Sequence, residues 1–174
     1  MRPTRKLLMI SETIGLLKNA LKNPTYGVNV YLTSSSLPTI ADVYTETTDY
    51  WMTAGGTPPT FPVLMITLAE DVNFLMPEVR TSIRDVEITL AISYWTKILS
   101  THTGIDQSYK TLACVMNSLR QWSKNENAAA RIDGNIQIME MTTIRQTPRI
   151  VSNEQDVNLL SSLMITFRVR DINP

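Results

Sequence analysis

Residues 84 to 95, RDVEITLAISYW, limit the fold more than any other stretch of the chain. Two sets of side chains alternate along it, with Val86, Ile88, Leu90, Ile92 and Tyr94 on one side and Asp85, Glu87, Thr89, Ala91 and Ser93 on the other. A period of two residues is typical of a β-strand with one buried face. Because strands usually have about five or six residues, this stretch predicts an unusually long strand, and the fold must supply neighbours for it.

The composition favours one domain spanning residues 1–174, since a chain of this length buries a hydrophobic core. No apolar run approaches the roughly 18 residues that a membrane span requires. The apolar run in MRPTRKLLMI is interrupted by Ser11 and Glu12 before a secretory core is complete. We therefore expect a soluble protein without a signal peptide, made in the cytoplasm. The single cysteine, Cys114, excludes an intrachain disulfide and fits a reducing compartment.

The net charge of zero predicts no overall attraction to nucleic acid or to an anionic membrane. The charges are nevertheless unevenly distributed. No Lys or Arg lies between Lys22 and Arg80, and the acidic residues of that stretch are Asp42, Glu46, Asp49, Glu70, Asp71 and Glu78. The stretch thus carries six negative charges, and the rest of the chain carries the matching positive surplus.

The first sixty residues predict a helix followed by a long excursion. Residues 4–22 carry an apolar stripe at helical spacing, formed by Leu7, Ile10, Ile14, Leu17 and Leu21. Residues 26–32 are consistent with a short strand that has Val28 and Val30 on one face. Residues 33–60 show no apolar periodicity and are rich in Ser, Thr, Gly and Pro, which predicts a long loop or arm. Loops of this length are usually functional or disordered.

The rest of the chain alternates between strands and a helix. Residues 61–69 are apolar on both faces, as in a central strand. Asp106 is placed to cap a helix over 107–123, whose stripe is Leu112, Val115, Met116, Leu119 and Trp122. Residues 136–143 and 160–170 read as strands, joined by a loop or distorted hairpin over 145–158. The order predicts an α+β fold, with a mostly antiparallel sheet and both helices on one face.

The sequence offers little for catalysis or metal binding. One histidine and one cysteine cannot build a structural zinc site. His102 and Cys114 carry no family signature as base and nucleophile, and Cys114 lies away from the apolar stripe of its helix, so it is either at the surface or packed against another element. Gly55-Gly56 lacks the lysine of a phosphate loop. We predict no catalytic residue, no cofactor and no metal.

Two charged groups have a functional and a structural interpretation. The pairs Glu70-Asp71 and Asp85-Glu87 suit acid–base chemistry or cation binding, but solvated carboxylates are the commoner case. Arg145, Arg149, Arg168 and Arg170 suggest a basic patch. No aromatic side chains are interleaved with them and acidic residues lie nearby, so nucleic-acid recognition is weakly supported.

The order of elements resembles the tail-terminator and tail-completion (neck) proteins of tailed bacteriophages. The resemblance lies in an N-terminal amphipathic helix followed by FPVLMITLAED, DVEITLAISYW, QSYKTLACVMNSLRQW, IQIMEMTTIR and SLMITFRVRD. It covers roughly residues 7–23 and 61–171, while the excursion at 33–60 is longer than in the family. The resemblance implies a virion protein that is not an enzyme. Such a subunit forms a ring, often hexameric, which ends the tail tube and joins it to the head connector while DNA passes through the centre.

The uneven charge agrees with a ring, because head-to-tail contacts use two different patches on each subunit. Acids of the excursion would face a neighbour's arginines, and its large apolar side chains would seek a surface to cover. The interface candidates are Asp42, Glu46, Asp49, Tyr50, Trp51, Met52, Arg145 and Arg149. Alternatively, the acids only keep the arm soluble. Two other classes also remain open, a small enzyme or ligand-binding domain and an adaptor that holds a peptide along a sheet edge.

Overall fold

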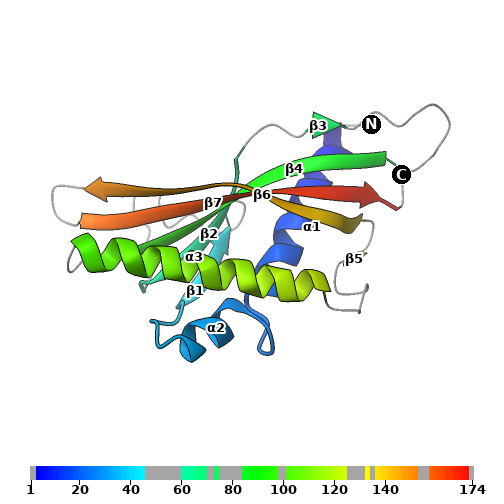
Figure 1. The fold of residues 1–174 in the computed structure, drawn as a ribbon. Helices are drawn as coiled ribbons and strands as arrows, with labels where there is room; N and C mark the ends of the chain where they lie inside the picture. The colour runs from blue at the N-terminus through cyan, green and yellow to red at the C-terminus, as the bar shows by residue number, and fades with distance from the viewer. Residues whose placement is uncertain are drawn as a thin grey trace.

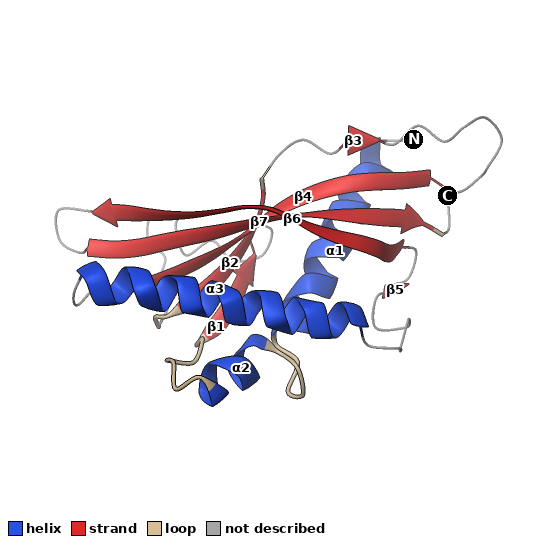
Figure 2. Cartoon of the chain, viewed as in Figure 1, coloured by secondary structure: helices blue, strands red, loops and turns tan. Residues whose placement is uncertain are grey.

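The computed structural model describes residues 3–45, 60–69, 73–74, 84–97, 101–124, 132–133, 136–152 and 157–172. These residues form three helices and seven strands, in the order α1 (Pro3–Leu21), α2 (Val28–Ser34), β1 (Asp42–Thr45), β2 (Val63–Leu68), β3 (Asn73–Phe74), β4 (Arg84–Lys97), α3 (Thr101–Lys124), β5 (Ile132–Asp133), β6 (Ile136–Ser152) and β7 (Val157–Asp171). The fold is α+β, as the sequence predicts (Figures 1 and 2).

All seven strands belong to one sheet, in which the order is β1-β2-β4-β7-β6-β5 and β3 pairs with β4. Only β1 and β2 are parallel, and every other pairing is antiparallel. The three longest strands are neighbours: β4 pairs with β7 along its whole length, and β7 pairs with β6. The long strand predicted from the alternating sequence is therefore real, and it lies between β2 and β7.

One face of β4 and β7 carries the core. Val86, Ile88, Leu90, Ile92 and Tyr94 are buried, and so are the alternate residues of β7. Helices α1 and α3 pack against each other and against this part of the sheet, so the two predicted helices share one face. Figure 1 shows α3 running along the long strands with α2 on its far side. No helix among the described residues is long and apolar enough to cross a membrane.

The predicted helix stripes are largely confirmed. In α1, Ile10, Ile14, Leu17 and Leu21 are buried. Leu7 is 66% exposed, so its place in the stripe was wrong. In α3 the members of the stripe are Leu112, Val115, Leu119 and Trp122, which are buried, and Met116, which is partly buried.

The predicted strand over 26–32 is wrong, because Val28–Ser34 form helix α2. Val28 and Leu32 are both buried and stand four residues apart, which suits a helix and not a strand. The side chain of Asn29 accepts a hydrogen bond from the Ile40 N–H at 2.7 Å and donates one to the Ile40 carbonyl at 3.0 Å. Packing and this clamp override the strand preference of the two valines.

The predicted loop over 33–60 is also wrong in part. Helix α2 extends to Ser34, and Asp42–Thr45 form strand β1 beside β2. Ile40 and Val43 are buried in the same core as the helices. A strand of four residues is too short for its alternation to stand out from the surrounding Ser and Thr. The rest of the excursion, residues 46–59, lies outside the described part of the chain.

Two further boundaries differ from the prediction. Helix α3 begins at Thr101, so Asp106 does not cap it, and its carboxylate instead pairs with Lys110 one turn later at 2.7 Å. Strands β6 and β7 continue through most of 145–158, so the distorted hairpin is the correct one of the two alternatives for this segment, and both strands are longer than predicted. Two register shifts in β6, at Ile138/Glu140 and Thr143/Arg145, broke the simple alternation on which the prediction depended.

Candidate assembly interface

Asp42, one of the candidate acids, lies in β1 near one edge of the sheet, and Arg149, one of the candidate arginines, lies in β6 toward the other edge. The backbone register links Asp42 in β1 to Val63, Trp95, Leu160 and finally Arg149 in β6. Asp42 and Arg149 therefore stand at opposite ends of one row of strand partners. Of these candidates the structure thus separates the backbones of Asp42 and Arg149 by the three strands β2, β4 and β7.

On the β1 side, Asp42 is held by a partner of its own chain. The Lys22 ammonium donates a hydrogen bond to its Oδ1 at 2.8 Å, and the Val43 N–H donates to the same atom at 2.7 Å. Burial by itself raises the pKa of Asp42, but these bonds outweigh it and the pKa lies below its ordinary value. The other acidic and aromatic candidates, Glu46, Asp49, Tyr50, Trp51 and Met52, lie outside the described residues.

On the β6 side, only the backbone of the two candidate arginines is described. Arg145 pairs with Met164, and Arg149 pairs with Leu160, both in β7. The sequence placed Arg145 and Arg149 in a loop or a distorted hairpin, and the structure places them in β6, which forms a hairpin with β7. Beyond β6, only β5 continues the described sheet, and it pairs only with Ile136 and Gln137.

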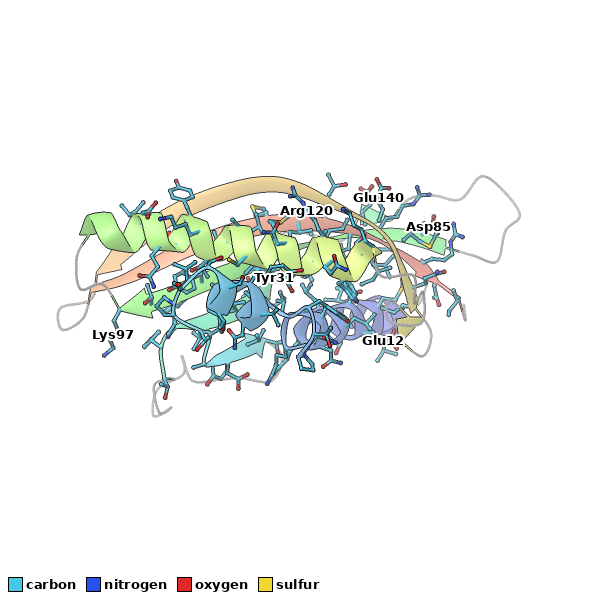
Figure 3. All side chains as sticks on the ribbon, turned by 60° about the horizontal axis from the view of Figure 1, so that its bottom comes forward. Glu12, Tyr31, Asp85, Lys97, Arg120 and Glu140 are labelled. Carbon is cyan, nitrogen blue, oxygen red and sulfur yellow. The ribbon has the colours of Figure 1, made fainter. Side chains whose placement is uncertain are left out.

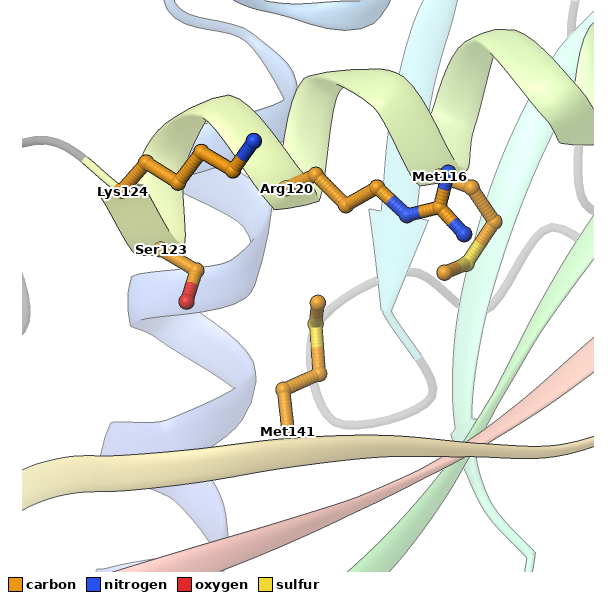
Figure 4. Close-up of a pocket in the computed structure, with 5 residues that line it drawn as sticks. All are labelled: Met116, Arg120, Ser123, Lys124 and Met141. Atoms are coloured by element: carbon orange, nitrogen blue, oxygen red, sulfur yellow. The ribbon is translucent and has the colours of Figure 1, made fainter.

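A pocket of about 290 Å³ lies beside this strand, between β6 and the C-terminal half of α3. Its lining residues are Met116, Arg120, Ser123 and Lys124 from α3 and Met141 from β6 (Figure 4). The four helix residues recur at helical spacing on the flank of the apolar stripe. They put two cations and a hydroxyl beside two thioethers. The pocket was not predicted from the sequence, although Met116, Arg120 and Lys124 recur there at helical spacing.

Asp85 lies at the centre of a charged cluster on the face of the sheet opposite the helices. Arg168 donates to its Oδ2 from Nη2 at 2.7 Å and from Nε at 3.0 Å. Arg170 donates to Oδ1 from Nε at 2.9 Å and to Oδ2 from Nη2 at 3.3 Å. The hydrogen bonds from Arg170 and Arg168 hold the pKa of Asp85 below its ordinary value, although burial opposes them.

This cluster corrects the prediction that Asp85 is a solvated carboxylate. Its side chain is only 11% exposed, while the side chains of Arg168 and Arg170 are 45% and 34% exposed. Arg168 and Arg170 are two residues apart in β7, and their common partner shows that they lie on the same face of the strand. Figure 3 shows Asp85 and Glu140 near the same end of the long strands. The Asp85 carboxylate thus ties two arginines of β7 to β4 across the strand pair, which is a structural role.

Two pairs of hydroxyl side chains lie further along β4 and β7, on the same face of the sheet as Asp85. Thr89 and Thr166 are joined Oγ1 to Oγ1 at 2.9 Å, and Ser93 and Ser162 are joined Oγ to Oγ at 2.8 Å. Each pair links β4 to β7 directly across the ladder. Thr89 and Ser93 are buried, so these two pairs satisfy hydroxyl groups that the fold removes from water.

Those residues considered for catalysis that the structure describes are not gathered into a site. Cys114 is buried and its Sγ lies 3.9 Å from the Ser35 Oγ, just after α2. Of the two placements that the sequence left open, packing against another element is therefore correct. His102 lies in the first turn of α3, and its side chain is outside the described part. Within the described residues, no group of three or more acidic, His or Cys side chains is placed to hold a metal ion.

Comparison with known proteins gives one informative likeness, in structure. No family model matches the chain, and no curated protein matches it by sequence. The fold is similar to that of a chain from the solved structure described as "Virion of native gene transfer agent (GTA) particle". The two chains share 13% sequence identity with a TM-score of 0.59, and the match covers 93% of this chain and 97% of the other. At this identity the likeness shows a common fold.

Proposed function

We propose that this protein is a structural virion protein of the neck of a phage-like particle. Several copies, six by family resemblance, form a closed ring that ends the tail tube and joins it to the head connector. DNA passes through the centre of the ring. The partners are further copies of the chain, the tail tube protein and the head–tail connector or adaptor proteins.

The observation that carries the proposal is the extent of the structural likeness. Almost the whole of this chain matches almost the whole of a chain from a phage-like virion. A match over both full lengths concerns the arrangement of all major elements and not a common supersecondary motif. Fold alone does not specify function, but the likeness and the independent resemblance of element order to neck proteins lead to the same class.

The two different sides of the sheet support head-to-tail association. Strand β1 runs parallel to β2, and three antiparallel pairings then lead to β6, so β1 and β6 run in opposite directions. A neighbour in the same orientation brings its β1 side antiparallel to β6. The row from Asp42 to Arg149 then places the acidic start of the 42–49 segment level with Arg149 of the next copy. Such a contact uses unlike surfaces and closes into a ring when the rotation permits.

The polar face of the sheet suits a channel that conducts DNA. A wall with free arginines would bind phosphates and release counterions, which is the main source of non-specific DNA affinity. Here Arg168 and Arg170 are both committed to Asp85, and the Thr and Ser hydroxyls are paired to each other. Sharing the Asp85 carboxylate reduces, without cancelling, the positive charge that Arg168 and Arg170 would offer to DNA phosphates.

Charge reversal tests the proposed contact. We expect Arg149→Glu to weaken self-association of the full chain, measured by sedimentation velocity, and Glu46→Lys or Asp49→Lys to restore part of it. Asp42 is a poorer rescue position because Lys22 already holds it. Lys110→Glu is the matched control, since Lys110 pairs only with the exposed Asp106 among the described residues. Normal association of Arg149→Glu at low salt would refute this interface.

A further inference from the structure

We propose that the pocket between α3 and β6 receives residues 70–78 of the neighbouring copy. This inference rests on the proposed ring and adds to it a second contact, distinct from the one at Arg149. It assigns an occupant to a hollow at the margin of the core, against which Met116 and Met141 pack, and it states which parts of two copies meet at this end of the sheet.

The pocket has the chemistry of a site for an acidic and apolar segment. Arg120 and Lys124 are exposed, and neither has an acidic partner among the described residues. Cations near a helix C-terminus also complement the helix dipole, which accounts for their charge. It does not account for the hollow beside them, which is lined by the thioethers of Met116 and Met141. Methionine side chains adapt to aromatic and aliphatic partners.

The volume of the pocket limits the kind of group that can occupy it. About 290 Å³ lies at the lower limit of the range for small-molecule sites, which is about 300 to 1,000 Å³. The pocket therefore suits one or two side chains of a docked segment better than a cofactor. The Ser123 hydroxyl, which also lines the pocket, adds a donor and acceptor for the backbone or carboxylate of such a segment.

Residues 70–78, EDVNFLMPE, match this chemistry. Three acids enclose Phe, Leu and Met, and the segment contains no Lys or Arg. It belongs to the 23–79 stretch, which contains six acids and no Lys or Arg. The segment is thus complementary to the pocket in both charge and apolar content.

The sheet register puts this segment at the level of the pocket on the next copy. Strand β3 pairs Asn73 with Glu87. The same row continues through Arg168 to Glu140 in β6. Glu140 is followed by Met141, which lines the pocket. In a head-to-tail pair, the β3 side of one copy therefore meets the β6 side of the next at the height of the pocket.

Photocrosslinking of the full chain identifies the occupant. The photoreactive residue p-benzoylphenylalanine replaces Ser123, and copies with heavy and light nitrogen are mixed before irradiation. Cleavage after Glu releases 71–78 as one peptide, because Glu70 and Glu78 flank it. We expect crosslinks between copies on this peptide. The same photoreactive residue at Asn117, which is exposed on α3 and does not line the pocket, is the control.

Charge reversal gives a second readout. We expect Arg120→Glu with Lys124→Glu to weaken association about tenfold, as two reversed ion pairs at an exposed contact imply, and Glu78→Lys to recover part of the loss. Crosslinks confined to one copy, or reaching another segment of a neighbour, overturn the inference but leave the ring standing. A chain that never associates refutes the proposed function, and this inference with it.

Discussion

The Asp85→Asn substitution tests whether the charged cluster on the sheet is a structural lock. The amide keeps the shape of the side chain but removes its charge and points an N–H₂ group toward a guanidinium. In the native cluster, two guanidinium groups donate four hydrogen bonds to this one carboxylate. The substitution therefore removes the common hydrogen-bond acceptor of Arg168 and Arg170. In the native protein this carboxylate joins β4 to β7, and Asp85 and Arg168 are 83 positions apart in the sequence.

The expected cost lies between two limits. Hydrogen bonds to charged groups contribute about 1.5 to 3 kcal/mol, whereas exposed ion pairs contribute about 0.2 to 1 kcal/mol. The carboxylate is 11% exposed but the arginines are more open, so solvent screening reduces the upper limit. We expect Asp85→Asn to lower the free energy of unfolding by about 1 to 2 kcal/mol. For a domain of this size, each kcal/mol lowers Tm by about 2 to 4 °C.

The sign of the pH dependence follows from the pKa of Asp85. Because the pKa in the folded state lies below the ordinary value of 3.8, the carboxylate stabilises the protein fully above the unfolded-state pKa. The contribution is lost as the pH falls through the folded-state pKa. The difference in stability between the native protein and Asp85→Asn is therefore greatest at neutral pH and shrinks below about pH 4.

Urea unfolding at several pH values measures this difference. Glu87→Gln is the matched control, since Glu87 lies on the same face of β4 and makes no ion pair in the described part of the chain. It should change stability by less than about 0.5 kcal/mol. A cost for Asp85→Asn that stays constant from pH 7 to pH 3 would show that the carboxylate charge does not stabilise the sheet.

Three further predictions concern the core, the excursion and the suspected catalytic pair. Trp122→Ala should cost about 3 to 5 kcal/mol in urea unfolding, because Trp122 is fully enclosed in the core; a cost below 1 kcal/mol would place it outside. Deleting 46–57 should leave far-UV circular dichroism unchanged and abolish association in sedimentation. The deletion starts after Thr45 because one that started at Ile40 would also remove core residues. If the variant that lacks 46–57 unfolds, these residues belong to the core. Cys114→Ala and His102→Ala should each change stability by at most about 1 kcal/mol without changing association, and lost particle infectivity with normal assembly would reopen the enzymatic interpretation.

The long elements were predictable because their periodicity is repeated many times. Strand β4 shows ten alternating positions between Asp85 and Tyr94, and the stripe of α3 extends over three turns. Each repeat adds evidence for the same face. The sheet and its two main helices were therefore accessible from the sequence alone, together with the side of each that is buried.

The short elements were not predictable, because tertiary contacts decide their conformation. Helix α2 contains two valines and a tyrosine in seven residues, which favours a strand locally. Its helical state depends on the burial of Leu32 and on the clamp between Asn29 and Ile40, residues that the sequence does not connect. Strand β1 exists because β2 lies beside it, and β2 follows 18 residues after its end at Thr45.

The candidate site shows the same limit. The sequence showed Asp85 and the Arg168–Arg170 pair separately, as a solvated acid and a possible basic patch. Their contact depends on the register between β4 and β7, which a sequence without a connecting turn does not reveal. The pocket beside β6 depends in the same way on where Met141 meets α3. The charge imbalance could be predicted from the sequence, because it does not depend on how the strands are paired.

Imaging of the purified full chain by negative-stain electron microscopy, with its mass determined by native mass spectrometry, tests the central claim most directly. The proposed neck function predicts closed rings with a central channel and a mass that is a whole multiple of the 19.6 kDa chain, with six copies expected. A population that remains monomeric or dimeric at every protein concentration, and in which a tightly bound small molecule accompanies the chain, would contradict it.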